Sequence, residues 1–408
     1  MSLNIQYIKK NIFLYSISVG HGVKHIFSSS VQVLIPFIKE SLSLSGVQIG
    51  ALATANSISS GLINAPAGLL TDLFNKRLGI LISLSAFIMF IGFLLISFLS
   101  ASNWIFLGFI AFIILGAGPN IWHPPAFAVL SHKYPDKKAF ALGVHLSAAS
   151  AGNAIGPLLT GALLSGIVIL NIFSLNLNWR EVGTLISILC LILSIVIFSF
   201  HSRIAISSNS NINLKIYFFK AIESLKKIEV IAMISLHAIR QAVHGAFTIY
   251  LLIYLKESLN LSAVSIGFHY SLIGISGVIF TPLWGSLSDR FGRLPIITLG
   301  MFLTSFFIIL IYIGNSGAIL ILLLLLLGCV LFAIIPVIAA AAMEYTVPGT
   351  EGTSVSLLFT GGAILGSMSP LIAGLLYDLN GFNSVIIFTS VLSLMGAIIA
   401  FFAWIKFK

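Results

Sequence analysis

The sequence contains the twelve-residue stretch KESLSLSGVQIG at residues 39–50, and a close copy of it, KESLNLSAVSIG, at residues 256–267. Nine of the twelve positions are identical, and the copies are 217 residues apart. The same offset relates GLLTDLFNKR (68–77) to GSLSDRFGRL (285–294). Because self-similarity at a fixed spacing is the sequence signature of a repeated structural unit, the chain is predicted to contain two copies of one fold.

The composition places these copies in a membrane. Of the 408 residues, 58% are hydrophobic and only 8% are charged, whereas about a quarter of the residues of soluble domains are charged. A transmembrane helix needs about 20 consecutive, mainly apolar residues. Twelve such runs follow one another with short loops between them: residues 11–37, 46–70, 78–100, 104–131, 139–169, 179–201, 229–255, 262–283, 294–313, 317–343, 352–376 and 383–405.

One long polar segment divides the twelve runs into two sets of six. It comprises residues 202–228, SRIAISSNSNINLKIYFFKAIESLKKI. We therefore predict an all-α membrane protein with twelve transmembrane helices in two pseudo-symmetric six-helix bundles. The predicted divisions are an N-terminal bundle (1–201), a cytoplasmic linker loop (202–228) and a C-terminal bundle (229–408). Parallel repeats of this kind are typical of secondary transporters, with the substrate site between the repeats near the midplane.

The positive charges indicate the orientation of the predicted helices. Of the 21 lysines and arginines, 16 fall in loops on the side of the N-terminus. Cytoplasmic loops carry an excess of Lys and Arg, so we expect a multi-pass protein of the cell (inner) membrane with both termini in the cytoplasm. The N-terminus lacks a small-residue cleavage site and is interpreted as a retained first helix. The net charge of +10 then reflects the positive charge of the cytoplasmic loops. Nucleic-acid binding would need a clustered basic face with aromatic residues among the charges, and the sequence shows none.

The paired segments at 68–77 and 285–293, which we call the signature segments, resemble the loop 2–3 and loop 8–9 signature of the major facilitator superfamily. The matching residues are Gly68, Leu70, Asp72, Lys76 and Arg77 in the first copy, and Gly285, Leu287, Asp289, Arg290, Gly292 and Arg293 in the second. Asn75 stands where the family usually has glycine, and Asn tolerates a left-handed backbone better than most residues. The resemblance covers the whole chain and implies the major facilitator fold.

The resemblance also implies a role for the signature segments. Glycine lets two helices approach closely, and an aspartate at a helix end can accept from arginines or from a neighbouring helix N-terminus. By resemblance, these contacts close the cytoplasmic side in one state and break in the other. The expected cytoplasmic gate comprises Gly68, Asp72, Lys76, Arg77, Gly285, Asp289, Arg290 and Arg293.

The fifth predicted helix contains GVHLSAASAGNAIGPLLTGALL at 143–164. Its residues Gly152, Gly156, Pro157 and Gly161 resemble the Gly-x-x-x-Gly-Pro pattern of antiporter members of the superfamily. Small residues permit close helix packing, and the proline removes a backbone hydrogen bond and permits a bend. The resemblance implies a packing and hinge role for these four residues, and efflux by antiport.

The fourth predicted helix contains GAGPNIWHPPAFAVL at 116–130. It is similar to the His-Pro segment of the fosmidomycin-resistance branch of the superfamily, at His123 and Pro124. This resemblance implies drug resistance by export. The helix has no arginine, although common multidrug exporters have one there, which disfavours a general multidrug exporter.

Basic residues line one face of the first and seventh predicted helices. In the first, His21, Lys24 and His25 share a face at 3.6 residues per turn. In the seventh, the residues that share a face are His237, Arg240, Gln241 and His244. The 217-residue offset pairs Lys24 with Gln241, beside Arg240. A charge at the bilayer centre costs about 2.5–3.5 kcal/mol on insertion scales, so we expect both faces to line a wet cavity.

The carboxylates leave these basic residues without an obvious partner. All eleven Asp and Glu residues fall in loops or at helix ends. An anionic substrate would supply the missing negative charge to Lys24 and Arg240, and the Arg fork fits carboxylate, phosphate or phosphonate. The predicted substrate-binding residues are Lys24, Arg240, Gln241, His21, His25, His123, His237 and His244.

Histidine is also the predicted proton carrier. Its charge changes near neutral pH, and no carboxylate lies at mid-membrane to bind and release the proton instead. The candidates are His21, His25, His123 and His244. We interpret His145 and His269 as interhelical hydrogen-bonding residues.

The predicted function is secondary active transport of a small, anionic solute or drug by alternating access, coupled to protons and directed outward. Proton-coupled uptake of an organic anion is the alternative, because the motifs do not give a direction. The expected partners are the lipid bilayer, the anion and protons, and the chain is expected to act as a monomer without a cofactor.

Three other classes are disfavoured. A histidine-rich membrane metalloenzyme could use His21 and His25, four residues apart, as metal ligands, but the histidines are scattered and lie among cations. We therefore expect neither a metal nor an enzyme. The sequence contains no phosphate-binding loop for ATP, which disfavours a primary pump. The longest polar segment, at 202–228, is too short for the signalling domain of a sensor.

Overall fold

The computed structural model describes residues 2–169, 173–201, 204, 223, 226–345 and 351–407. Its first half contains α1 (Ser2–Leu42), α2 (Gly46–Leu62), α3 (Asn64–Leu73), α4 (Leu78–Ser97), a π-helical turn (Trp104–Gly108), α5 (Phe109–Ile121), α6 (His123–Lys133), a 3₁₀ turn (Pro135–Lys137), α7 (Lys138–Ser165), β1 (Ile167–Ile169), β2 (Phe173–Leu175) and α8 (Trp179–His201). The second half contains α10 (Ile228–Glu257), α11 (Ala263–Phe291), α12 (Arg293–Ile311), α13 (Gly317–Leu331), α14 (Ile334–Glu344), α15 (Glu351–Gly366) and α16 (Ser369–Lys406). The predicted linker 202–228 lies almost wholly outside the described residues.

The helical membrane fold predicted from the sequence is confirmed. Eleven of the twelve predicted runs fall on one helix or on consecutive helices, and the run 139–169 ends in a strand. Within the described part of the chain, eight helical stretches are long and apolar enough to cross a membrane. The number of crossings, twelve, stays a prediction. α16 contains the end of the run 352–376 and all of the run 383–405. Its backbone is not helical between them, at Asn380 and at Gly381, where φ is 68°.

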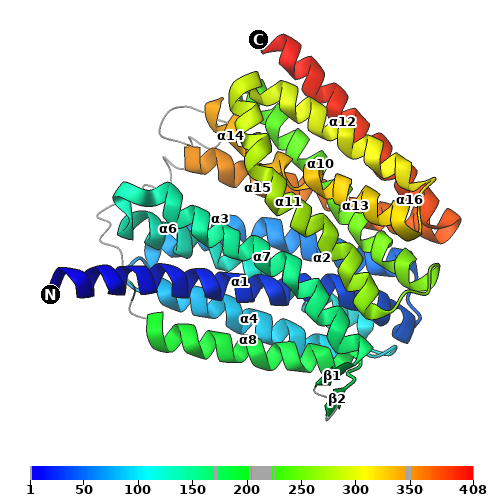
Figure 1. Ribbon diagram of the computed structural model, residues 1–408, viewed down its shortest axis with the longest axis horizontal. Helices are drawn as coiled ribbons and strands as arrows, with labels where there is room; N and C mark the ends of the chain where they lie inside the picture. Colours follow the sequence, from blue (N-terminus) through cyan, green and yellow to red (C-terminus); the bar gives the residue numbers. More distant parts are fainter. Residues whose placement is uncertain are drawn as a thin grey trace.

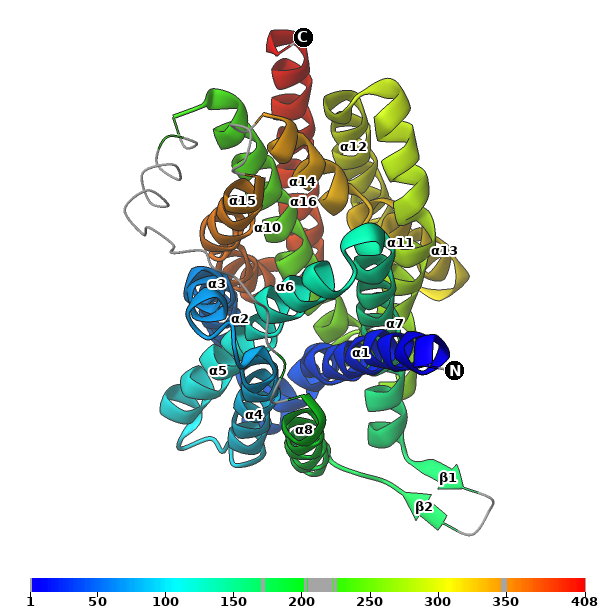
Figure 2. The same cartoon turned by 90° about the vertical axis from the view of Figure 1, so that its left-hand side faces the viewer.

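A small hairpin corrects one helix boundary. The sequence analysis placed 139–169 in a single helix, but α7 ends at Ser165 and Gly166 takes a φ of 88°. The next residues, Ile-Val-Ile, are β-branched and favour a strand. β1 pairs antiparallel with β2, with Ile167 opposite Leu175. The hairpin projects from the end of α7 (Figure 2).

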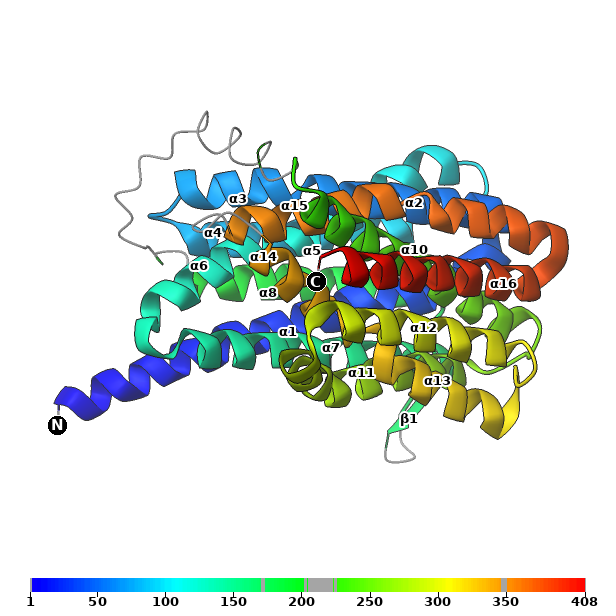
Figure 3. The ribbon, with the colours of Figure 1, turned by 90° about the horizontal axis from the view of Figure 1, so that it is seen from above.

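The two halves of the chain meet at one end and diverge toward the other. In Figure 1 the helices α1–α8 and α10–α16 form two groups that converge at the end away from both termini. α7 packs on α11 and α2 packs on α16, so each half contributes to the junction. Figure 3 shows the start of α1 extending beyond the other helices at the N-terminus.

Close backbone contacts hold α7 between the two halves. A Cβ on Gly152 would collide with the carbonyl oxygen of Gly22 in α1, and a Cβ on Gly156 would collide with the backbone of Ile26. Further along α7, Gly161 meets the backbone of Ala263 in α11 in the same way. A Cβ on Gly267 of α11 would likewise collide with the carbonyl oxygen of Pro157. Small residues therefore let α7 touch one helix of each half, as small-residue packing in membranes requires.

Candidate functional site

Lys24 lies at the centre of a buried basic cluster that also contains His21, His25 and His123. Its side chain is 0% exposed. Its Nζ donates to the carbonyl oxygen of Pro119 at 3.2 Å and lies 3.5 Å from Nε2 of His123. Both partners flank the break between α5 and α6. The structure therefore brings the basic residues of α1 together with the His-Pro segment.

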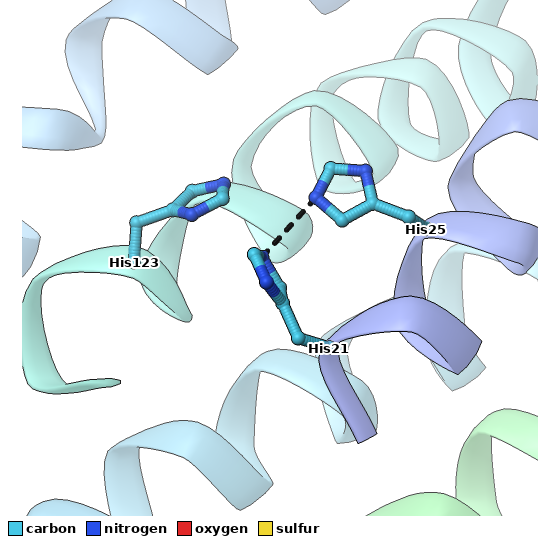
Figure 4. A group of neighbouring side chains, drawn as sticks. All are labelled: His21, His25 and His123. Atoms are coloured by element: carbon cyan, nitrogen blue, oxygen red, sulfur yellow. Dashed lines mark hydrogen bonds between the residues drawn. The ribbon is translucent and has the colours of Figure 1, made fainter. Parts of the chain in front are cut away.

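The two histidines of α1 point at each other. Nε2 of His25 lies 3.2 Å from Nε2 of His21, as Figure 4 shows. Nδ1 of His21 lies 3.0 Å from the carbonyl oxygen of His145, and Nδ1 of His25 lies 3.0 Å from Oδ1 of Asn153. His21 is buried, whereas His25 and His123 are partly exposed. α7 thus orients both imidazoles by accepting from their outer nitrogens.

His145, interpreted from the sequence as an interhelical hydrogen-bonding residue, lies beside this cluster. Its ring stacks on His21 with 3.9 Å between centroids. Neither of its ring nitrogens has a hydrogen-bond partner among the described residues. His145 was not predicted to belong to the site, because the sequence indicates the helix that carries it but not that this helix packs against His21.

The cluster has the geometry to hold a metal ion. The ligand atoms of His21, His25 and His123 lie within 4.8 Å of one another, and imidazole suits Zn, Cu, Fe and Ni. The ammonium of Lys24 stands beside His123, however, and a buried positive charge opposes a divalent cation at this range. We therefore do not assign a metal to this cluster.

Arg240 is the centre of a second group, in the other half. It is 4% exposed, and its Nε donates to the carbonyl oxygen of Leu331 at 2.9 Å. One terminal nitrogen donates to Gln241 Oε1, and the other has no partner in the described chain. His244 packs edge-on against Phe332, whose ring also lies 5.3 Å from the Arg240 guanidinium carbon.

His237 is separated from this group. Its ring packs edge-on against Phe359, with 4.9 Å between centroids. Both of its nitrogens lack a hydrogen-bond partner among the described residues. The structure therefore brings Arg240, Gln241 and His244 together and leaves His237 against α15.

Both buried cations donate to a carbonyl beside a broken helix. Lys24 uses Pro119 near the α5–α6 break, and Arg240 uses Leu331, the last residue of α13 before α14. Irregular backbone at membrane depth is tolerated where protein or a water-filled cavity satisfies it. The first break was predicted from its two prolines, whereas the second was missed although Pro336 is the third residue of α14.

A cavity of about 180 Å³ lies between the halves and is lined mainly by neutral side chains. Its polar lining residues are Gln32, Asn56, Ser57, Ser60, Gln241, His244 and Thr248. Only Gln241 and His244 had been predicted; Lys24 and Arg240 do not line this cavity. Gln32 follows His25 by seven residues, two helical turns along the same face, so the stripe could have been extended to it.

The glycines of the two signature segments, Gly68 and Gly285, face open space in this arrangement. A Cβ on Gly68 or Gly285 would have no described atom within 4 Å. Asp289 pairs with Arg293, which also reaches Glu344 at 2.8 Å, so this network stays within the second half. None of the ion pairs found among the described residues joins the two segments. The expected close approach at these glycines is therefore absent here, and the gate remains a proposal.

The opposite end is closed by ion pairs between the repeated stretches. Lys39 pairs with Glu257 at 2.6 Å, and Lys256 pairs with Glu40 at 3.2 Å. The hydroxyl of Tyr377 donates to Glu257 at 3.0 Å. We call these residues, together with Asp378, the far-end contact: each copy of Lys-Glu binds the other copy. The two stretches were predicted only to be a repeat, and nothing in the sequence indicated that they bind each other.

Backbone contacts reinforce the far-end contact. The Asp378 carboxylate accepts from the backbone N–H groups of Gly46 (2.6 Å) and Val47 (2.9 Å), at the N-terminus of α2, where a negative charge is favoured. The Tyr250 hydroxyl lies 2.9 Å from the Gly46 carbonyl oxygen and 2.8 Å from that of Pro370. Three helices, α2, α10 and α16, are thereby joined at this end.

Reversing one charge of the far-end contact should open it. In Lys39→Glu, two carboxylates face each other where an ion pair stood, and we expect transport to fall by about 5-fold, since partly exposed pairs contribute up to about 1 kcal/mol. Cross-linking of Ser165→Cys to Val264→Cys should fall with it, because Ser165 Oγ lies 2.8 Å from the Val264 nitrogen. The double reversal Lys39→Glu with Glu257→Lys should restore both. Unchanged cross-linking in the single variant would contradict the assignment.

These features together define a class of protein. Duplicated helical halves, a polar cavity between them and a closed contact at one end describe a secondary transporter that works by alternating access. A model of the Major Facilitator Superfamily matches residues 17–249 and 233–407. The chain belongs to the major facilitator superfamily.

Individual relatives are distant. The chain is 25% identical over 399 residues to the uncharacterised MFS-type transporter YfnC of Bacillus subtilis (strain 168), covering 96% of this chain and 94% of that one. It is 23% identical over 400 residues to the fosmidomycin resistance protein of Escherichia coli (strain K12), covering 95% and 92%. A solved bacterial homologue of the human lysosomal transporter Spinster, inward-facing and unoccupied, superposes with a TM-score of 0.78 at 15% identity, covering 97% and 96%.

Membership of this family gives the general activity. The chain is a multi-pass transporter of the cell membrane that moves a small molecule across the lipid bilayer. It is not an enzyme, because this is a family of transporters. The fosmidomycin-resistance branch, suspected from His123 and Pro124, is represented among the relatives.

Proposed function

We propose that this transporter moves a small organic anion and couples its movement to protons. The observation that carries the proposal is a pair of buried cations, Lys24 and Arg240, on α1 and its repeat partner α10. Neither forms an ion pair in the described part of the chain. A buried charge without a counter-charge is costly, and an anion that enters between the halves would offset that cost at both residues.

The neutral cavity complements the cations. Its amide and hydroxyl groups can donate to and accept from the uncharged part of a substrate, while Gln241 connects the cavity to Arg240. Small-molecule sites commonly combine a few placed polar groups with a larger surface of contact. The proposed substrate therefore has one anionic group and a polar body.

For the direction of transport, export is the first candidate. It rests on the helix-5 glycine pattern and on the name of one relative, a fosmidomycin resistance protein. In this proposal the monomer keeps both termini in the cytoplasm, and the signature segments, with Asp72 and Asp289, close the cytoplasmic side when the far-end contact opens. Uptake is the second candidate, and the pairing of His21 with His25 favours it, as argued below.

Growth in the presence of fosmidomycin, an anionic phosphonate, tests the proposal and its direction together. A sensitive bacterium that expresses the protein should tolerate more drug if the anion is exported and less if it is taken up. Lys24→Met, present in the membrane in equal amount, should remove either effect. An unchanged inhibitory concentration with the wild-type protein would contradict a phosphonate substrate.

A further inference from the structure

The hydrogen bonds made by His21 and His25 leave no hydrogen between their two Nε2 atoms. A backbone carbonyl only accepts, so Nδ1 of His21 carries the hydrogen that it donates to His145. Nδ1 of His25 likewise faces an acceptor, Oδ1 of Asn153. A neutral imidazole has a single N–H. With the Asn153 amide oriented as in this structure, both Nε2 atoms of the neutral pair are bare lone pairs, and they face each other at 3.2 Å (Figure 4).

Two lone pairs at hydrogen-bonding distance repel each other unless a cation lies between them. One proton is sufficient: bound to one Nε2, it is donated to the other and forms an N–H⁺···N hydrogen bond, which is stronger than a neutral one. The proton comes from water, and the pair changes charge from zero to +1. We propose that His21 and His25 together bind one shared proton, and that this proton travels with the anion.

The surroundings of the pair determine how the proton and the anion influence each other. Lys24 faces it from α1, His123 from α6 with its centroid 5.1 Å from that of His21, and His145 from α7 at 3.9 Å. The neutral Trp122 stacks at 5.8 Å. None of these groups is negatively charged, and Lys24 in its protonated form places a positive charge beside the pair. A proton beside Lys24 is thus opposed by Coulomb repulsion, and a bound anion relieves it.

Coupling between two ligands is reciprocal. If the anion strengthens proton binding, the proton strengthens anion binding by the same factor. The two then occupy the same state of the carrier and cross the membrane together, which is co-transport and not exchange. This inference rests on the proposed anion site, and it assigns the sign of the coupling. With an inward proton gradient, co-transport drives uptake.

The route to the pair is consistent with this role. His25 and His123 are partly exposed, so water can reach the outer side of the cluster, whereas His21 is 0% exposed. His25 is therefore the member that exchanges its proton with water, and His21 is the member that shares it.

Nitrogen NMR of purified protein labelled with ¹⁵N-histidine tests the shared proton without any substrate. The two Nε2 signals should titrate together, with one proton gained for both rings. His25→Gln, which cannot hold the proton, should abolish this step and leave His21 neutral. His269→Gln, on α11 in the other half, is the matched control and should leave the step unchanged. Two independent steps, no step between about pH 5 and pH 8, or one tightly bound metal ion per chain would overturn the shared proton.

Fosmidomycin, added at a fixed pH where the pair is half protonated, tests the coupling. Proton occupancy of the pair should rise, and Lys24→Met should prevent the rise. Binding of the anion, seen as a higher melting temperature, with unchanged occupancy would overturn co-transport and leave anion transport standing. Absence of any binding would count against the proposed substrate, while the titration without substrate would still decide the proton site.

Discussion

Transport of the anion should be lost when Lys24 is replaced by methionine. Removal of one member of a buried, hydrogen-bonded charge pair costs about 2–5 kcal/mol, and we expect the initial rate to fall by at least about 30-fold. Methionine is close to lysine in length and apolar, so the buried volume around the 0% exposed side chain is largely kept. The measurement is the initial rate of fosmidomycin movement into or out of membrane vesicles, normalised to the amount of protein in the membrane.

Lys137→Met provides the matched control. Lys137 is an exposed lysine in a turn at the start of α7, and its replacement should leave the rate within about twofold of the wild type, as is usual for surface changes. Arg240→Met should behave like Lys24→Met. Normal transport by both Lys24→Met and Arg240→Met would contradict the anion site.

A leucine at Gly152 should reduce transport by about 10-fold or more, because overpacking a tight contact costs about 1–3 kcal/mol. The new side chain would meet the carbonyl oxygen of Gly22, and its Cβ would lie 2.9 Å from Cβ of His25. α1 and α7 would have to separate, which also pulls Asn153 away from the His25 ring. The melting temperature of the purified protein and the transport rate are the two measurements.

The same helix offers the control for Gly152→Leu. A Cβ on Gly143 would have no described atom within 4 Å. Gly143→Leu should therefore leave both the melting temperature and the transport rate nearly unchanged, although it makes the same chemical change in α7. Equal losses in the two variants would show that the effect comes from leucine in α7 as such, and would contradict the role of the close contact.

Much of the fold was predictable because each helix carries its own signal. An apolar run of about 20 residues indicates a membrane helix whatever its neighbours are. The grouping of His21, Lys24 and His25 was predictable for a similar reason, since residues three and four apart lie on one helical face. His123 was found because two prolines follow it directly.

The contacts between distant segments were not predictable in this way. Lys39 and Glu257 are 218 residues apart, and nothing in either stretch shows that the two copies face each other. The lining of the cavity was not predicted, because polar residues such as Asn56 and Ser60 are also common where membrane helices pack against each other. Glu344 was classed only as a residue at a helix end, and its pairing with Arg293 depends on how α12 and α14 are packed.

The reciprocal pairing of the far-end contact has a consequence for how such a protein can arise. Lys39 binds Glu257 while Lys256 binds Glu40, which is the pattern of an isologous interface, in which one surface meets itself across a two-fold axis. A homodimer of single six-helix chains would form both pairs from one Lys-Glu dipeptide. Fusion of two such genes would then free each pair to diverge. The two pairs do differ here: one is 2.6 Å long and includes Tyr377, and the other is 3.2 Å long.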